Sequence, residues 1–354
     1  MSWAALKHKL SFAFFSGDRK FCHYLDPHDE NIKSILCLPP SGIGDVVMQA
    51  PAITALKNAY PQSHLTVLSH DYSGTSEVCR LMPSVDEVID IGIPKYTWLS
   101  LLRYLLSRFW TLSFKLRKRR YDLVVSYIPN PVRKLFVLSV ARKYWIYGNT
   151  TDGFPGKLSF DILKQLKMPS EGINEVFKIP EPATERRAFL DSCTRPIIGI
   201  HPFCGSSWRQ WNHFESLIHK MAGLNATILV VGQQSGYSTD AGVKNLVNML
   251  SIAELFWAIG KCDAFITADS GPMHVAFSLD IPTVAIFGAV KPSLRVPENK
   301  EDRIRVLYKP SDISEKIDLA IPRKQLDNQV MQSITVDQVM KETTQLLKGM
   351  GHSI

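Results

Sequence analysis

Short apolar runs alternate with helix-length segments along most of this chain. The runs lie at 34–38, 64–69, 88–91 and 122–126 in the first half, and at 197–200, 227–231, 264–267 and 283–287 in the second. Each run has the length of a buried strand, and most of the segments between them are long enough for a crossover helix. Strands that alternate with helices predict parallel sheets and therefore an α/β fold.

A proline-rich joint divides this pattern in two. Residues 179–182 read Ile-Pro-Glu-Pro, and a polar helix leads from them to Arg195-Pro196, where a new strand begins. A chain of 354 residues also suits two domains better than one. We expect an N-terminal extension at 1–31, domains at 32–190 and 191–330, and a C-terminal helix and tail at 331–354. Trp3, Leu6, Leu10 and Phe14 share one helical face of the extension, which fits either membrane contact or packing on a domain.

The segment 265–288 predicts an anion-binding turn. It reads as a buried strand that ends in Asp269, a tight Ser270-Gly271-Pro272 turn, and a helix with His274 in its first turn. A helix N-terminus binds anions because its unpaired N–H groups and its dipole point at one place. Proline suits the first helical position, where a missing N–H has no cost. The alternative is an ordinary connection between a helix and a strand of a parallel sheet.

The loop after the first strand carries a candidate base. Gly42 and Gly44 begin a glycine pattern of the dinucleotide-binding kind, but Val47 stands at the third glycine position. The acid expected for a ribose is also missing after the second strand, which ends in Ser69-His70-Asp71. The glycines fit a substrate that approaches the backbone closely. They place Asp45 at a helix start, where it could be a general base or simply cap the helix.

A second loop, His201 to Trp211, follows the first strand of the second half. Its small hydroxylated residues, Arg209 and its aromatic side chains fit a ligand that carries phosphate and a flat ring. The alternative is a surface loop whose two tryptophans pack back on the core. Gln234 follows the next strand and could contact a ribose or sugar hydroxyl, although a polar connecting loop explains it equally well.

Composition narrows the class of protein. The net charge of +8 and the pI of about 9.1 favour an anionic partner such as a nucleotide or a lipid phosphate. Six scattered cysteines without a Cys-x-x-Cys pair indicate a reducing compartment and argue against structural zinc. No apolar stretch is long enough to span a membrane, and the one at 10–15 is too short for a signal peptide. We therefore expect a cytoplasmic protein.

The positive charge is concentrated at the end of a long amphipathic helix. Arg117, Lys118, Arg119 and Arg120 form a basic run. They follow an apolar stripe that we expect to face the core, made of Trp98, Leu101, Leu102, Leu105, Phe109, Leu112 and Leu116. Four consecutive cations are costly to bury and could bind a phosphorylated glycolipid or the anionic inner face of the inner membrane. A solvated helix end explains them equally well.

Three blocks of the sequence resemble glycosyltransferase family 9, the family of the ADP-heptose–lipopolysaccharide heptosyltransferases. They are 41–57, 201–211 and 269–274, and their order and spacing match roughly from 32 to 345. The resemblance implies a GT-B architecture, in which two Rossmann-like parallel-sheet domains face each other across a cleft. It assigns the acceptor side to 32–190 and the nucleotide-sugar donor to 191–330.

The resemblance also implies roles for individual residues. Asp45 is the catalytic base, on an acceptor-side loop with Ser41, Gly42 and Gly44. Candidate donor-binding residues are Ser207, Arg209, Gln234, Asp269, Ser270, Gly271, Met273 and His274. Arg209 stands where lysine is usual, and Gln234 lies near a position that often carries an acid. These departures affect the identity of the donor more than the reaction.

Together these residues predict a metal-independent, inverting transferase. Two aspartates separated by one residue hold the metal of many glycosyltransferases, and the chain has no such pair. Backbone N–H groups at 270–274, with Arg209 and His274, would meet the charge of the departing nucleoside diphosphate without a cofactor. Asp45 would take the proton of the acceptor hydroxyl.

The substrates and the rival functions follow from the same resemblance. We expect heptose transfer from ADP-heptose onto a lipopolysaccharide core or a related surface glycan. The alternatives are a family 9 transferase that uses another nucleotide sugar, and an inactive GT-B-like nucleotide-binding protein. Nucleic-acid binding fits less well, because no aromatic residues interleave the basic run on a known module.

Overall fold

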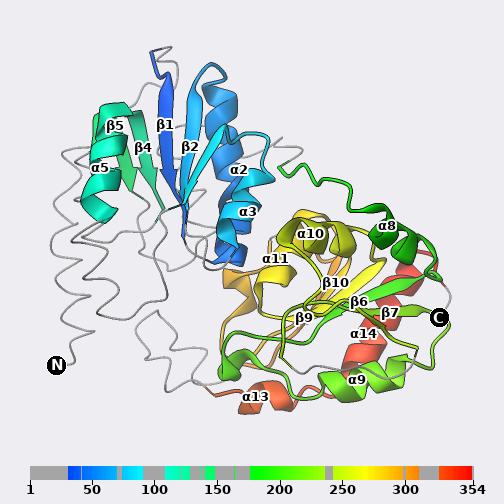
Figure 1. The fold of residues 1–354 in the computed structure, drawn as a ribbon. Helices are drawn as coiled ribbons and strands as arrows, with labels where there is room; N and C mark the ends of the chain where they lie inside the picture. Colours follow the sequence, from blue (N-terminus) through cyan, green and yellow to red (C-terminus); the bar gives the residue numbers. More distant parts are fainter. Residues whose placement is uncertain are drawn as a thin grey trace. The chain divides into compact units, whose positions relative to one another are not determined.

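Two compact units, Met1–Lys178 and Ile179–Ile354, make up the chain in the computed structural model. The structure describes residues 31–40, 42–69, 74–90, 108–119, 121–127, 137, 140–147, 163, 176–235, 242–297, 300–310 and 327–352. Each unit contains one parallel β-sheet with its helices (Figure 1). The expected α/β class is therefore confirmed.

The first unit is built on a five-stranded parallel sheet with the order β3-β2-β1-β4-β5. Its strands are β1 (Ser34–Leu38), β2 (His64–Ser69), β3 (Glu87–Asp90), β4 (Tyr121–Ser126) and β5 (Ala141–Tyr147). Its helices are α2 (Ile43–Ala59), α3 (Thr75–Arg80) and α5 (Arg108–Arg119). The apolar pattern predicts the first four strands but misses β5, whose sequence carries two cations, Arg142 and Lys143, before its apolar residues.

Helix α5 packs apolar side chains on one face of this sheet. Leu116 is buried and Leu112 lies against the same cluster, which includes Leu36 of β1 and Val124 of β4. The prediction that the apolar stripe faces the core is therefore confirmed for these two leucines. The other positions of the stripe lie outside the described side chains.

The second unit is built on a six-stranded parallel sheet with the order β11-β10-β9-β6-β7-β8. Its strands are β6 (Ile197–His201), β7 (Thr227–Val230), β8 (Lys244–Asn245), β9 (Ala264–Ala268), β10 (Thr283–Ile286) and β11 (Ile304–Leu307). Its helices are α8 (Thr184–Asp191), η3 (Ser207–Arg209), α9 (Phe214–Met221), α10 (Ile252–Gly260), α11 (Gly271–Ser278), η4 (Pro292–Leu294), α13 (Gln329–Gln332) and α14 (Val336–Gly349). The sequence pattern misses the edge strands β8 and β11, which are short and carry charged residues.

Helices cover both faces of the second sheet (Figure 1). Helices α9 and α14 pack on the face that carries Val284 and Ile286. Helix α11 packs on the opposite face, where Met273 and Phe277 contact Ala285 and Phe287. Alternate residues of β10 thus serve opposite faces, as the two-residue period of a strand requires. Both layers leave the carboxyl ends of the strands to the connecting loops.

Candidate functional site

Most of the predicted site residues follow the strands between which the strand order of each sheet reverses. In the second sheet this point is between β6 and β9, which are hydrogen-bonded neighbours with His201 opposite Thr267. In the first sheet it is between β1 and β4. Successive connections leave such a point in opposite directions, so a ligand finds room beside the carboxyl ends of the two strands. Asp45 follows β1, and Asp269 follows β9.

Asp45 lies in the first turn of α2, and Gly42 provides the space for its carboxylate. A Cβ added at Gly42 would lie 2.8 Å from Asp45 Oδ2, so a side chain there would force the carboxylate to shift. Gly42, and not Asp45, holds the capping position of the helix. The half-buried carboxylate is near the positive end of α2, which stabilises a negative charge. Gly44 is buried in the same turn, and Ser41 lies outside the described residues.

The turn after β9 presents a helix N-terminus without a side-chain cap. Helix α11 begins at Gly271, and Ser270 occupies the capping position with φ −148° and ψ 169°. No side-chain hydrogen bond joins Ser270 to the helix. Pro272 has no N–H and the N–H of His274 makes the first bond of the helix, so the amides of Gly271 and Met273 are the donors at this end. An end of this kind can bind an anion.

The Ser270 hydroxyl instead joins a buried hydrogen-bond chain. Ser270 Oγ lies 3.0 Å from Thr267 Oγ1 and 3.2 Å from His201 Nδ1. Thr267 Oγ1 donates to the Ala268 carbonyl over 2.9 Å. Burial lowers the pKa of His201 to about 4, so its imidazole is neutral near physiological pH. Sequence reasoning assigned no role to His201, because its partner lies 69 residues away in the chain.

Arg209 brings a positive charge to the same turn. Its Nη1 donates to the Asp269 carbonyl over 3.2 Å and lies 3.9 Å from Asp269 Oδ2. Its guanidinium also lies over the ring of Trp208, 5.0 Å from Cζ to the ring centre. Within the described part of the chain, Arg209 Nε and Asp269 Oδ2 are buried without a hydrogen-bond partner. Both groups therefore have capacity left for a ligand.

His274 is buried in the first turn of α11 and is neutral. Burial, with the positive charges of Arg295 and Arg209, lowers its pKa to about 3. His274 can therefore offer a ring N–H, and its part in neutralising a diphosphate stays a prediction. Arg295, next to η4, is a second cation near this turn that sequence reasoning missed. Nothing in its local sequence, Pro-Ser-Leu-Arg, marks a site.

The other predicted donor residues differ in what they expose. Met273 is fully buried against Phe287, so only its backbone N–H can serve a ligand at this turn. Ser207 is exposed on η3. Gln234 is exposed, and its backbone is held by Asn248, whose side chain accepts from Gln234 N over 2.9 Å and donates to Gln234 O over 2.7 Å. The part played by each in donor binding stays a prediction.

Trp211 belongs to the core rather than to the site. Its ring is fully buried, and Nε1 donates to the Ile334 carbonyl over 3.0 Å. The neighbouring Gln210 donates to the Pro202 carbonyl over 2.8 Å, which closes the loop on itself. The interpretation that the tryptophans pack back on the core is thus right for Trp211. Trp208 is only half-buried and lies under Arg209.

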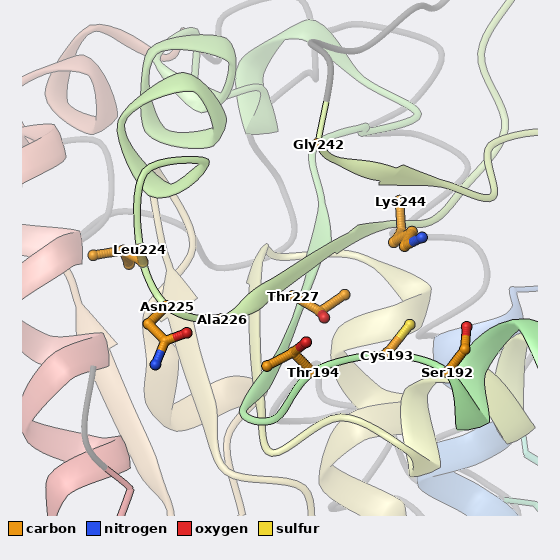
Figure 2. Close-up of a pocket in the computed structure, with 9 residues that line it drawn as sticks. All are labelled: Ser192, Cys193, Thr194, Leu224, Asn225, Ala226, Thr227, Gly242 and Lys244. Carbon is orange, nitrogen blue, oxygen red and sulfur yellow. The ribbon is translucent and has the colours of Figure 1, made fainter.

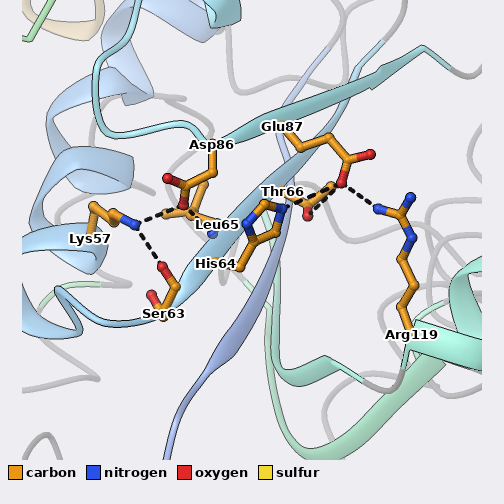
Figure 3. A network of polar contacts seen from close by, with 8 residues as sticks. All are labelled: Lys57, Ser63, His64, Leu65, Thr66, Asp86, Glu87 and Arg119. Atoms are coloured by element: carbon orange, nitrogen blue, oxygen red, sulfur yellow. Dashed lines mark hydrogen bonds and ion pairs between the residues drawn. The ribbon is translucent and has the colours of Figure 1, made fainter.

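One residue of the basic run forms a structural ion pair. Arg119 donates to Glu87 Oε2, which also lies 3.5 Å from His64 Nε2 and 3.5 Å from Thr66 Oγ1 (Figure 3). The hydrogen bond from Arg119 lowers the pKa of Glu87. Arg119 therefore links the end of α5 to the edge strand β3, and its charge is not free for a partner.

The rest of the run is exposed next to an aromatic ring. Arg117 and Lys118 are exposed, and Lys118 Nζ lies 4.7 Å from the ring centre of Phe114. Phe114 is itself 62 % exposed, although it is a large apolar side chain. Arg120 lies outside the described residues. Among the residues that the structure describes, no helix combines the length and the apolar character needed to cross a bilayer.

A pocket of about 290 Å³ lies at the end of the second sheet that is opposite to the Asp269 turn (Figure 2). Thr227 begins β7 and Lys244 begins β8, and both line it, so the pocket is at the amino ends of the strands. Ligands of such sheets bind at the carboxyl ends. We therefore place the functional site at the Asp269 turn and not in this pocket.

Comparisons with known proteins agree with the resemblance found in the sequence. The model of glycosyltransferase family 9 (heptosyltransferase) matches residues 158–316. The lipooligosaccharide heptosyltransferase 2 of Haemophilus ducreyi is 25 % identical to this chain over 364 residues, which covers 88 % of this chain and 99 % of the relative.

Solved structures share the fold. The glycosyl transferase family 9 protein from Veillonella parvula gives a TM-score of 0.70 at 19 % identity, and the match covers 92 % of this chain and 98 % of that one. The ADP-heptose lps heptosyltransferase II of E. coli gives a TM-score of 0.64 at 18 % identity, over 90 % of this chain and 100 % of that one. These similarities confirm the GT-B fold class with two parallel-sheet domains.

Proposed function

Because this chain is a glycosyltransferase that resembles family 9, we propose that it transfers heptose from ADP-heptose onto a lipopolysaccharide core or a related surface glycan. The observation that carries the proposal is the uncapped N-terminus of α11 with Arg209 beside it, at the strand-order reversal of the second sheet. A nucleoside diphosphate departs in this reaction, and this place offers both N–H donors and a cation for its charge. The similar proteins named as heptosyltransferases support the choice of sugar.

The donor diphosphate binds at the α11 turn in this proposal. The amides of Gly271 and Met273 donate to the phosphate oxygens, and Arg209 neutralises part of their charge. Arg295 supplies a second positive charge near the same turn. These groups stabilise the leaving group most when the bond to the sugar breaks, because the negative charge on its oxygen is then greatest.

Asp45 acts as the general base. It removes the proton of the acceptor hydroxyl while that oxygen forms a bond to the anomeric carbon. The bond from this carbon to the β-phosphate oxygen breaks, and ADP leaves with the electron pair. Attack from the face opposite the leaving group inverts the anomeric centre, and one carboxylate is sufficient for that course.

We propose that the reaction needs no metal ion. Within the described residues, His, Cys, Asp and Glu side chains form no group of three that could hold one. Arg209, Arg295 and the α11 amides can supply the charge stabilisation that a metal gives elsewhere. Transfer by the protein as purified should therefore be unchanged by excess EDTA. Loss of transfer in EDTA, restored by one divalent cation, would contradict the proposal.

A release assay with Asp45 variants tests the function. Wild-type protein should release ADP from ADP-heptose only when a heptose-accepting lipopolysaccharide core is present. Asp45→Asn should lower turnover by about 10²- to 10⁴-fold, the usual contribution of a general base. Calorimetry should find ADP binding unchanged in the variant, because the diphosphate site is on the other unit. An active Asp45→Asn enzyme excludes this base, and a wild type that binds ADP without transfer supports the inactive alternative.

We also propose that α5 touches an anionic membrane surface. Lys118 and Arg117 are exposed beside Phe114, and an apolar ring flanked by cations suits the headgroup region of such a surface. Phe114→Ser and Lys118→Glu should each weaken binding to phosphatidylglycerol vesicles, and neither should change binding to phosphatidylcholine. Lys341→Glu, an exposed lysine of α14, is the matched control. Equal vesicle binding by all variants would contradict membrane contact and favour the interpretation that the basic run is a solvated helix end.

A further inference from the structure

Only one assignment of hydrogens makes all three contacts of the chain under the α11 turn hydrogen bonds. Each hydroxyl has a single hydrogen. Thr267 gives its hydrogen to the Ala268 carbonyl, so Ser270 is the donor in the 3.0 Å contact between the two hydroxyls. The Ser270 oxygen therefore accepts in its 3.2 Å contact with His201, whose Nδ1 must carry the hydrogen. The chain runs from His201 through Ser270 and Thr267 to the carbonyl.

Packing holds the His201 ring in place. Its ring meets that of Phe203 edge to face, with 5.9 Å between the ring centres. Gly232 lies against both rings, since a Cβ there would be 2.9 Å from His201 Cδ2 and 2.5 Å from Phe203 Cδ2. His201 is 8 % exposed and neutral, so it keeps a single ring hydrogen, and the chain places this hydrogen on Nδ1.

This arrangement keeps the Ser270 side chain off the helix. A serine at the capping position ordinarily accepts from the N–H of the second or third helical residue. In α11 the second residue is Pro272, so the N–H of Met273 is the natural partner. Ser270 makes no such bond, because its oxygen is engaged with His201 and Thr267.

We propose that His201 is a positioning residue of the donor site. It holds the Ser270 hydroxyl away from α11, and so leaves the Met273 N–H open to the diphosphate of the nucleotide sugar. The inference rests on the proposed function, because it assumes that a diphosphate binds at this turn. It also changes the role of Ser270. The Ser270 hydroxyl faces the interior, and it competes with the ligand for the Met273 N–H when the hydrogen bond to His201 is lost.

Three variants with ADP as the probe test the role of His201. His201→Ala should release Ser270 to cap Met273 and weaken ADP binding about fivefold, the fold-change that one capping bond represents. Ser270→Ala in that background removes the competitor and should recover most of the affinity. Ser270→Ala alone should bind ADP within about twofold of the wild type, since the hydroxyl does not face the ligand. A role in packing alone predicts no recovery in the double variant.

Two further variants keep the test decisive. His201→Asn places an amide N–H near the position of Nδ1 and should bind ADP like the wild type. Thr267→Val keeps the shape of the side chain but removes the acceptor for Ser270. If His201→Ala does not fold, Thr267→Val replaces it, alone and combined with Ser270→Ala. Donor KM should rise and kcat should also fall, because the Met273 N–H stabilises the diphosphate most as the bond to the sugar breaks, and both should recover when Ser270→Ala is added.

The outcomes separate this inference from the proposed function. A wild-type chain that binds none of ADP, UDP and GDP in calorimetry overturns the proposed function, and the inference with it. Wild-type binding with a double variant no better than His201→Ala overturns the inference alone. Ser270→Ala that weakens ADP binding as much as His201→Ala also overturns it, because the hydroxyl would then be a ligand contact.

Discussion

Asp45 holds its carboxylate so close to Gly42 that a Cβ at position 42 would lie 2.8 Å from Oδ2. The sequence suggested that the glycines of this loop let a substrate approach the backbone. For Gly42 the structure gives another reason, which is that the room is taken by the candidate base itself. The glycine and the aspartate are therefore one functional unit, three residues apart on the first turn of α2.

Gly42→Ala should displace the carboxylate of Asp45 and slow transfer. The φ of Gly42 is −102°, which alanine adopts without strain, so the effect comes from the clash alone. Misplacing a reacting group by about 1 Å costs on the order of 100-fold in rate, and we expect kcat to fall by about 10- to 100-fold. ADP affinity, measured by calorimetry, should not change.

Gly223→Ala is the control for this substitution, because no heavy atom lies within 4 Å of a Cβ there. Its kcat and its ADP affinity should both equal those of the wild type. If Gly42→Ala transfers at the wild-type rate, the observed position of the Asp45 carboxylate is not the one used in catalysis.

Local sequence patterns predicted much of the fold and part of the candidate site. The strands β1, β6 and β9 are mostly apolar runs, and the turn after β9 is marked by Asp269-Ser-Gly-Pro in sequence. The short edge strands β8 and β11 are defined by pairing with a neighbour, which a local pattern does not contain. The contact of His201 with Ser270 and the effect of the Arg295 charge on His274 depend in the same way on elements far along the chain.

Arg209 should set the affinity for the diphosphate. Its Nη1 is fixed on the Asp269 carbonyl at 3.2 Å, which leaves its charge beside the α11 amides. Arg209→Met should weaken ADP binding about 10- to 100-fold, because a hydrogen bond to a charged group contributes about 1.5–3 kcal/mol. Arg209→Lys keeps the charge but loses the planar guanidinium group. Its ADP affinity should lie between those of the wild type and Arg209→Met. Calorimetry at two salt concentrations should also show a weaker salt dependence for Arg209→Met.

Arg187→Met is the matched control for charge. Arg187 is exposed on α8 and faces Glu181 and Asp191 in the same unit. ADP affinity should not respond to its loss. An Arg209→Met variant that behaves like Arg187→Met would remove Arg209 from the donor site.

Two buried histidines should make stability depend on pH. The pKa is about 4 for His201 and about 3 for His274, against 6.5 for a free histidine. Below a pH of about 6.5 the histidines of the unfolded chain bind protons, whereas the two buried histidines of the folded chain stay neutral. Their contribution to the free energy of unfolding is therefore complete above about pH 6.5 and is lost as the pH falls. Each histidine contributes a slope of about 1.4 kcal/mol per pH unit between these values.

Urea unfolding between about pH 7 and about pH 5 measures this slope, above the range in which carboxylates take up protons. His274→Gln keeps a side-chain N–H but cannot titrate, so the slope should fall to about half of the wild-type value. An unchanged slope in His274→Gln would mean that this histidine is charged or solvated in the folded chain.

Gly232 should be intolerant of a side chain for two separate reasons. Its φ of +134° is strained for any other residue, and a Cβ would lie 2.5 Å from Phe203 Cδ2 and 2.9 Å from His201 Cδ2. Gly242 has a φ of +93° but no atom within 4 Å of its Cβ, so Gly242→Ala measures backbone strain alone. We expect that variant to lose about 1–2 kcal/mol in the free energy of unfolding, and Gly232→Ala to lose about 1–3 kcal/mol more through crowding. Because His201 is one of the two crowded rings, Gly232→Ala should also weaken ADP binding, and Gly242→Ala should not. Equal losses of stability in the two variants would show that the loop moves aside and does not hold the histidine.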